Sequence, residues 1–494
     1  MQGIRSHTVL IALSIGLTGC ARAPSQPIEA TPVSVCERLL LRVDELIADA
    51  GVSDTFSARI EGFPHLRSSR FWASFANDKP TGSAYRFWLK NLRQLDAQAR
   101  SGELLNLPDA QRQTLQSFFS AGTRVEPVLD GCAQQLLQRD QNSPKTRKRL
   151  LARAKVPDAY VTWHRVIGLY PIVKWPFYRE VLKLHQELSQ TFQKPPAQIP
   201  VSGRLLRYSP AQAASLNRAQ VAKIIQDSSQ NPLAIPQPGT KDLEQLFETY
   251  APIWEIDTLD NNDRMGQIRL DKTGQAHVDS AHPTVYRLLS HTRFQQRNLM
   301  QLIYVIWFPA RTAEGIMDIY AGAFDGLIWR VTLSEEGEPI AYDSIHPCGC
   351  YYHLFPGEGF RFNPVQDGSE PVFSPKAFGM LALGERLLIR LSARKHFIQQ
   401  VYSEIEHLPS ITYRTSDYNA LRALALPGQE HRSSFFDTCG FTPGSERIER
   451  FLFWPMGVSN AGAMRQWGNH AIAFIGTRHF DDPALLQVLL RPAH

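Results

Sequence analysis

The spacing of apolar residues differs between the two halves of the chain. In the first half, Leu39, Val43, Leu46 and Ile47 recur at intervals of three and four residues, which predicts one face of a helix. The same spacing predicts further helices over residues 83–101, 109–120, 129–139 and 175–192. We therefore expect the first half to be mostly α-helical.

The second half follows the shorter period of β-strands. Residues 302–308 form a β-branched and aromatic run that ends at Pro309. Residues 316–324 and 327–333 flank Asp325-Gly326, a dipeptide that is typical of a two-residue hairpin turn. Further strands are predicted at residues 339–345, 387–391, 397–402, 451–454 and 471–475. This pattern predicts an antiparallel, hairpin-rich sheet with a few helices.

A proline-rich segment from Asn231 to Gly239 separates the two patterns and predicts a domain boundary. The chain of 494 residues is long enough for two or three domains, and 43% hydrophobic with 20% charged residues is ordinary for a folded protein. We expect an α+β protein. A mostly α-helical domain would cover residues 36–230, and an α+β domain would cover residues 240–494.

The N-terminus has the order of a secretory signal peptide. Arg5 precedes an apolar stretch of about ten residues, which ends in Leu17-Thr18-Gly19-Cys20. This ending resembles the lipobox of bacterial lipoproteins, and the resemblance covers residues 1–20 only. It implies removal of residues 1–19 and a lipid on Cys20. The residue after Cys20 is alanine rather than aspartate, which by resemblance to bacterial sorting rules favours the outer membrane over the inner one. An ordinary signal peptide with a chance cysteine is the alternative.

The expected compartment limits which partners the protein can meet. The apolar stretch is shorter than the roughly 20 residues that span a bilayer, so the lipid alone would hold the protein to the membrane. Three prolines within residues 20–35 predict a disordered tether. In the cell envelope, the cell wall or another envelope protein could be a partner. Nucleic acid is not expected, since the compartment lacks it and the net charge of +6 is mild.

If Cys20 carries lipid, five cysteines remain in an oxidising compartment, where pairs form disulfides. Cys36 and Cys132 are the cysteines of the helical half, and we predict a disulfide between them. Two buried free thiols are the alternative. The second half is left with an odd number of cysteines, which requires an explanation.

The segment His346-Pro-Cys-Gly-Cys-Tyr-Tyr-His353 offers an explanation for the odd number of cysteines. His346, Cys348, Cys350 and His353 place four soft-metal ligands within eight residues. In an extended chain, residues 346, 348 and 350 share one face, and Gly349 could permit a bend that brings His353 to them. Cysteine and histidine ligands suit zinc or copper, so the segment is a candidate metal site.

Three other interpretations remain open for this segment. Cys439 could form a structural disulfide with Cys348 or Cys350. The two cysteines could form a strained, reducible C-x-C bridge, or one could act as a nucleophile beside a histidine. We therefore carry two hypotheses. The first, which we favour because no complete catalytic signature is present, is a binding or structural envelope lipoprotein. The second is a metal- or thiol-dependent hydrolase that uses His346, Cys348, Cys350 and His353.

Overall fold

The computed structural model describes residues 34–211, 216–365, 367–379, 381–404 and 408–493. Cys20, the predicted signal peptide and most of the predicted tether lie outside these residues. The first part of the described chain contains the helices α1 (Val35–Asp49), α2 (Arg70–Asp78), α3 (Gly82–Leu105), α4 (Asp109–Gln116), α5 (Val125–Gln141) and α6 (Pro144–Arg153). The helices predicted over residues 83–101, 109–120 and 129–139 are confirmed, apart from their ends.

Local sequence explains where several of these helices begin. Ser34, Ser69 and Ser143 precede α1, α2 and α6, and each side chain accepts a hydrogen bond from the backbone N–H three residues later. Such caps satisfy an N–H group that has no partner within the helix. The short hairpin of β1 (Ala58–Ile60) and β2 (Phe63–Ser68) packs against α3.

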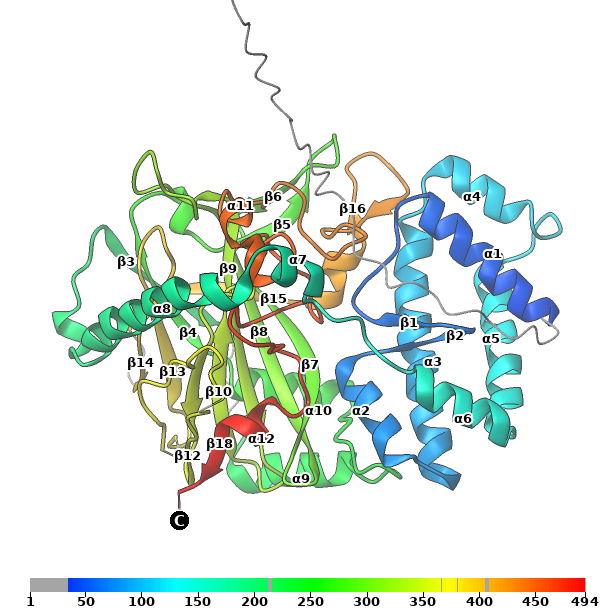
Figure 1. Cartoon of the computed structure of the whole chain (residues 1–494), viewed down its shortest axis with the longest axis horizontal. Helices are drawn as coiled ribbons and strands as arrows, with labels where there is room; N and C mark the ends of the chain where they lie inside the picture. Colours follow the sequence, from blue (N-terminus) through cyan, green and yellow to red (C-terminus); the bar gives the residue numbers. More distant parts are fainter. Residues whose placement is uncertain (1–33, 212–215, 366, 380, 405–407, 494) are drawn as a thin grey trace, which may run out of the picture. The chain divides into compact units, whose positions relative to one another are not determined.

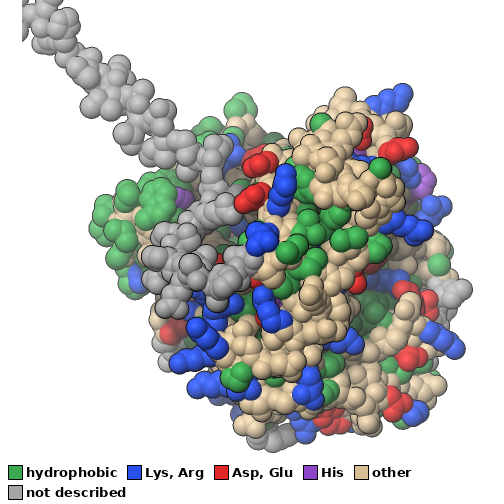
Figure 2. Space-filling model, turned by 90° about the vertical axis from the view of Figure 1, so that its right-hand side faces the viewer, with side chains coloured by type: hydrophobic (Ala, Val, Ile, Leu, Met, Phe, Trp, Pro, Cys, Tyr) green, Lys and Arg blue, Asp and Glu red, His purple; other side chains and the backbone are tan. Residues whose placement is uncertain are grey.

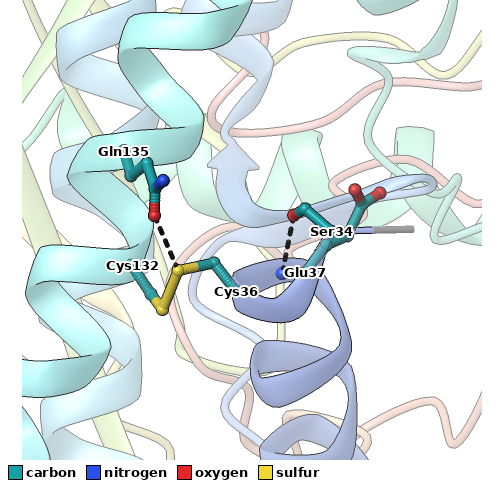
Figure 3. The surroundings of a disulfide bond; sticks show 5 residues. All are labelled: Ser34, Cys36, Glu37, Cys132 and Gln135. Carbon is teal, nitrogen blue, oxygen red and sulfur yellow. Dashed lines mark hydrogen bonds between the residues drawn. A yellow bond between two sulfur atoms is a disulfide. The ribbon is translucent and has the colours of Figure 1, made fainter. Parts of the chain in front are cut away.

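Cys36 on α1 and Cys132 on α5 form a disulfide, with the two sulfur atoms 2.08 Å apart (Figure 3). The predicted pairing is confirmed. The two helices also share a small apolar core that includes Leu40, Val43 and Leu136. The disulfide therefore links two elements that already pack together, and it closes a loop of 96 residues.

In the described chain, ten strands form one large sheet, in the order β11-β10-β9-β8-β7-β15-β3-β4-β13-β14. Most neighbours are antiparallel, but β15 runs parallel to β3 and β7, and β13 runs parallel to β4. The strands are β3 (Arg204–Pro210), β4 (Ile253–Thr258), β7 (Thr284–Phe294), β8 (Arg297–Arg311), β9 (Gly322–Leu333), β10 (Pro339–Ile345), β11 (His353–Pro356), β13 (Arg386–Leu391), β14 (Ile398–Glu404) and β15 (Ile411–Asp417).

The predicted fold class is wrong. β3 precedes the expected boundary at residues 231–239, yet it pairs with β4 and β15 inside the large sheet. The sheet is mixed rather than antiparallel. Every residue of β4 and of β13 is buried, which is typical of strands covered on both faces. Apolar patterning identifies such strands but does not say which neighbour they pair with or in which direction, because the rest of the fold decides that.

The sheet curls, and helices cover its inner face. α8 (Tyr170–Phe192) meets both edges of the sheet. The ring of Phe192 lies 6.0 Å from that of Phe355 on β11, and the carbonyl of Phe192 accepts a hydrogen bond from Gln400 on β14 at 2.8 Å. α9 (Arg218–Ser228) and α10 (Thr240–Thr249) pack against the same apolar core, at the bottom of Figure 1. The outer face packs against the C-terminal segments, including η3 (Tyr418–Arg422) and α12 (Leu485–Leu489).

The remaining elements are short. They are α7 (Thr162–Ile167), α11 (Arg450–Phe453), β5 (Gln267–Leu270), β6 (Ala276–Asp279), β12 (Phe360–Phe362), β16 (Leu424–Ala425), β17 (Arg432–Ser433), β18 (Leu490–Pro492) and the 3-10 turns η1 (Pro196–Gln198), η2 (Asn261–Asp263) and η4 (Trp454–Met456). The strand predicted at residues 451–454 is wrong, since this segment is α11 and the start of η4. The strand predicted at 471–475 is also wrong, because Ala471 makes only an isolated bridge to His479.

The hairpin predicted around Asp325-Gly326 is also wrong. Both residues lie within β9, where Asp325 is opposite Phe308 and Gly326 is opposite Trp307 on β8. A Cβ atom at Gly326 would lie 2.3 Å from the carbonyl oxygen of Ile306, so glycine is needed for a close approach of two strands. The glycine that suggested a turn thus serves a packing role.

Among the helices of the described residues, none combines the length and the apolar character that crossing a bilayer requires.

Candidate functional site

A cavity of about 1220 Å³ lies beside α8. Its walls come from α8, from residues 311–320, from the turn at residues 348–352, and from the segments around α11 and residues 471–474. Phe177 on α8 closes one side, with its ring 5.3 Å from that of Phe453 and 4.9 Å from that of Phe474. The cavity exceeds the usual size of a small-molecule site, so it has room for a long ligand.

Exposed apolar side chains lie next to this cavity. On α7 and the first turns of α8, six of them are at least half exposed: Trp163, Val166, Ile167, Leu169, Ile172 and Trp175. Met317 and Leu452 are also exposed, and together with Trp175 they line the cavity. Figure 2 shows hydrophobic side chains at its left edge, on the side where α7 and α8 lie in Figure 1. We call these eight residues the apolar rim. Exposed apolar groups of this extent mark surfaces that contact lipid or another apolar partner.

Three of the predicted metal ligands, His346, Cys348 and Cys350, fall on a tight turn between β10 and β11. The backbone N–H of Gly349 donates to the carbonyl of His346 at 2.8 Å, and that of His346 donates to the carbonyl of Cys350 at 3.0 Å. Gly349 has φ +92°, and a Cβ atom there would lie 2.2 Å from the carbonyl oxygen of Ala471. The chain is therefore bent rather than extended at Gly349, and residues 346, 348 and 350 do not form the expected common face.

His346 belongs to a buried network of histidines and carboxylates, in which burial lowers the pKa of its own ring. Its Nδ1 lies 3.2 Å from Asp325, whose other carboxylate oxygen lies 2.8 Å from Nδ1 of His396. Nε2 of His396 in turn lies 3.2 Å from Asp263. Burial opposes ionisation of Asp325, but the two histidines outweigh it and hold the pKa of Asp325 well below its usual range. The network joins β9, the turn after β10 and the turn before β14.

His353 lies apart from this network, on β11. It is buried among aromatic rings, 5.0 Å from the ring of Phe373, and its Nδ1 has no hydrogen-bond partner among the described residues. Burial lowers its pKa to about 3, so the ring is neutral at pH 7. Within the described residues, no group of three His, Cys, Asp or Glu side chains is placed to hold a metal ion. The predicted zinc or copper site of His346, Cys348, Cys350 and His353 is therefore not assembled.

Cys348 and Cys350 are both free thiols on the cavity wall. Neither is joined to Cys439, and they do not form a C-x-C bridge with each other. The adjacent Cys348 sulfur and burial hold the pKa of the Cys350 thiol well above its ordinary value. A nucleophilic cysteine requires the opposite shift, because the thiolate is the reactive form. The geometry therefore gives no support to Cys350 as a nucleophile.

The sequence did not predict a role for two buried charged residues that line the cavity. Arg311 ends β8 and Glu449 precedes α11, and they are only 7% and 5% exposed. Burial raises the pKa of Glu449 to about 7, although Arg311, Arg447 and Arg465 partly offset this effect. No local signal could have found them, since Arg311 follows an apolar run like any strand end and Glu449 lies in an ordinary polar stretch.

The comparisons with known proteins give no assignment. No protein-family model matches the chain, and neither a curated protein nor a solved structure matches it.

Proposed function

We propose that this chain is a lipoprotein of the bacterial cell envelope, anchored through Cys20, that binds an amphipathic molecule in the cavity beside α8. The cavity carries this proposal. It combines about 1220 Å³ of space with apolar walls, such as Val181, Leu184 and Ile472, and with buried charges from Arg311 and Glu449. A ligand with one long apolar part and one polar end would complement both regions.

The apolar rim supports the same proposal. Exposed tryptophans beside cationic side chains are typical of surfaces that lie at a membrane interface. Here the ammonium of Lys174 lies 5.2 Å from the ring centroid of Trp175, and Trp175 lines the cavity. The rim would therefore rest on the lipid surface to which the anchor holds the protein. A ligand could then pass between bilayer and cavity without exposing its apolar part to water.

A pair of variants on α8 tests whether the cavity is the binding site. Val181 lines the cavity, whereas the neighbouring Leu182 is exposed and does not. Val181→Trp should fill part of the cavity, and Leu182→Trp adds the same side chain on the outside. Full-length lipoprotein purified from membranes is examined by native mass spectrometry for a noncovalent amphiphile beyond its own anchor. We expect one adduct in the wild type and in Leu182→Trp, and a marked loss in Val181→Trp. Wild-type protein without any adduct would overturn the proposal.

Tryptophan fluorescence tests separately whether the apolar rim contacts lipid. In vesicles that contain the full-length protein and lipids with brominated tails, Trp163 and Trp175 should be quenched, whereas buried tryptophans such as Trp307 should not. The double variant Trp163→Phe/Trp175→Phe should lose the quenched component. Equal quenching in wild type and variant would mean that the rim does not reach the bilayer.

A further inference from the structure

Arg311 is buried in the cavity wall, and among the described residues no carboxylate lies within 4.0 Å of its guanidinium, although Asp325 and Asp318 attract it from farther away. Its guanidinium carbon lies 5.2 Å from the ring centroid of Tyr320 and 5.3 Å from that of Phe397. One terminal nitrogen donates a long hydrogen bond, 3.4 Å, to the hydroxyl of Tyr351. Its Nε is buried and has no partner among the described residues. Most of the donors of this side chain are therefore unused, in a position that faces the cavity.

Glu449 is a second buried charge that lacks a direct partner. Its carboxylate packs against the backbone at Gly462, where a Cβ atom would lie 2.0 Å from Oε1. Within the described chain, no cationic nitrogen lies within 4.0 Å of it. Arg447 and Arg465 are near, but their donors already bind backbone carbonyls, those of Ala323 and Phe324 for Arg447 and those of Cys348 and Ser459 for Arg465.

Several other buried charges of this chain are paired directly, although Arg447 and Arg465 bind backbone carbonyls instead. Arg67 contacts Glu103 at 2.7 Å, and Arg330 forms two hydrogen bonds with Asp343. Burial of a charge without a partner is costly, so an arginine and a glutamate of opposite sign would ordinarily pair when both line one cavity. Arg311 and Glu449 influence each other electrostatically, yet they are held more than 4.0 Å apart. Because both residues line the cavity, a ligand there that carries both charges would complement them.

We propose that Arg311 and Glu449 together recognise a zwitterionic headgroup, in which a phosphate binds Arg311 and an ammonium binds Glu449, as in phosphoethanolamine. This inference rests on the proposed function, because it names the polar end of the amphiphile in the same cavity.

The chemistry of both side chains favours such a group. The planar guanidinium offers paired donors that match phosphate oxygens, and carboxylates accept the N–H bonds of a primary ammonium. Tyr320 and Tyr351 also line the cavity, and both lie close enough to Glu449 and Arg311 to interact with them electrostatically. A purely anionic ligand would leave Glu449 unpaired and repelled, and a purely cationic one would do the same to Arg311. A headgroup with both charges satisfies the two residues at once.

Three single-chain lipids with the same acyl chain test the proposal: lysophosphatidylethanolamine, lysophosphatidylglycerol and monoacylglycerol. Full-length protein, stripped of copurified lipid, is titrated with each at pH 8 and bound lipid is measured by native mass spectrometry. Wild-type protein should bind the ethanolamine lipid at least about tenfold more tightly than monoacylglycerol, in line with charge-assisted hydrogen bonds. The wild type should also prefer lysophosphatidylethanolamine to lysophosphatidylglycerol, and Glu449→Gln should remove this preference. Arg311→Gln should weaken binding of both phospholipids by about tenfold, and Arg311→Lys should restore part of it.

The exposed Glu446 of the same segment supplies a matched control, and Glu446→Gln should behave as the wild type. Free phosphoethanolamine as a competitor separates a lipid headgroup from a small soluble ligand. If free phosphoethanolamine competes as strongly as the lipid does, the same site binds a small soluble ligand. If it competes weakly, the natural ligand is a lipid. Equal binding of all three lipids by the wild type would overturn the headgroup assignment while amphiphile binding stands. Failure of all three to bind would contradict the proposed function itself.

Discussion

Replacing Glu449 by glutamine should stabilise the protein at pH 8 and leave its stability nearly unchanged at pH 4. Burial raises the pKa of this carboxyl from 4.5 to about 7 in the folded protein. Between these values the folded state binds more protons than the unfolded state, so stability falls as pH rises through this window. A rise of the pKa from 4.5 to about 7 corresponds to a loss of about 3 kcal/mol in the free energy of unfolding at pH 8. Glutamine, which has no charge to bury, avoids this loss.

The assay is urea unfolding of wild type and Glu449→Gln at intervals from pH 4 to pH 8. The free energy of unfolding of the variant minus that of the wild type should rise by about 3 kcal/mol across this range, mostly between pH 4.5 and pH 7. Taking the difference removes the pH dependence of all other groups. Glu446→Gln, at an exposed position of the same segment, should show no such rise. A flat difference for Glu449→Gln would refute the reasoning, because it would mean that water or a partner stabilises the buried carboxylate.

Three further predictions concern the framework of the site. Replacing Cys36 and Cys132 by alanine should lower the free energy of unfolding by about 4 to 5 kcal/mol, because the disulfide closes a loop of 96 residues; a loss under about 1 kcal/mol in urea unfolding would contradict this. Asp325→Asn should cost about 3 to 5 kcal/mol, since two buried histidines lose a charged partner; an unchanged melting temperature would show that the network is not stabilising. Cys350 should react slowly with iodoacetamide at pH 7, because its pKa is raised, and rapid labelling seen by peptide mass spectrometry would contradict this.

Features that depend on near neighbours in the sequence were predicted correctly. The helices of the first half follow from apolar residues spaced by three and four, because each such helix hides one stripe of its own surface. The disulfide of Cys36 and Cys132 followed from the small number of cysteines and their place in the helical half. Strands such as β8 and β10 followed from β-branched and aromatic runs.

Predictions that required the position of distant segments failed. The dipeptide Asp325-Gly326 has the composition of a turn, but the imidazoles of His346 and His396 make a buried aspartate acceptable inside a strand. The ligands expected between His346 and His353 separate, because the backbone at Gly349 turns to pack against Ala471. Both errors arise because a local preference of about 1 kcal/mol is smaller than the tertiary contacts that oppose it.

The sequence by itself determined individual helices of the first half, strand-forming runs of the second, and one disulfide, and it raised the expectation of an envelope lipoprotein, which stays a prediction. These depend on short-range spacing or on a short motif. Only the tertiary structure decided that β3 joins the later strands in a mixed sheet, that α8 borders a large cavity, and that Arg311 and Glu449 line it together. Strand partners and cavity walls come from segments that are far apart in the chain. These segments meet because whole faces of the sheet and helices become buried, and no local pattern encodes that burial.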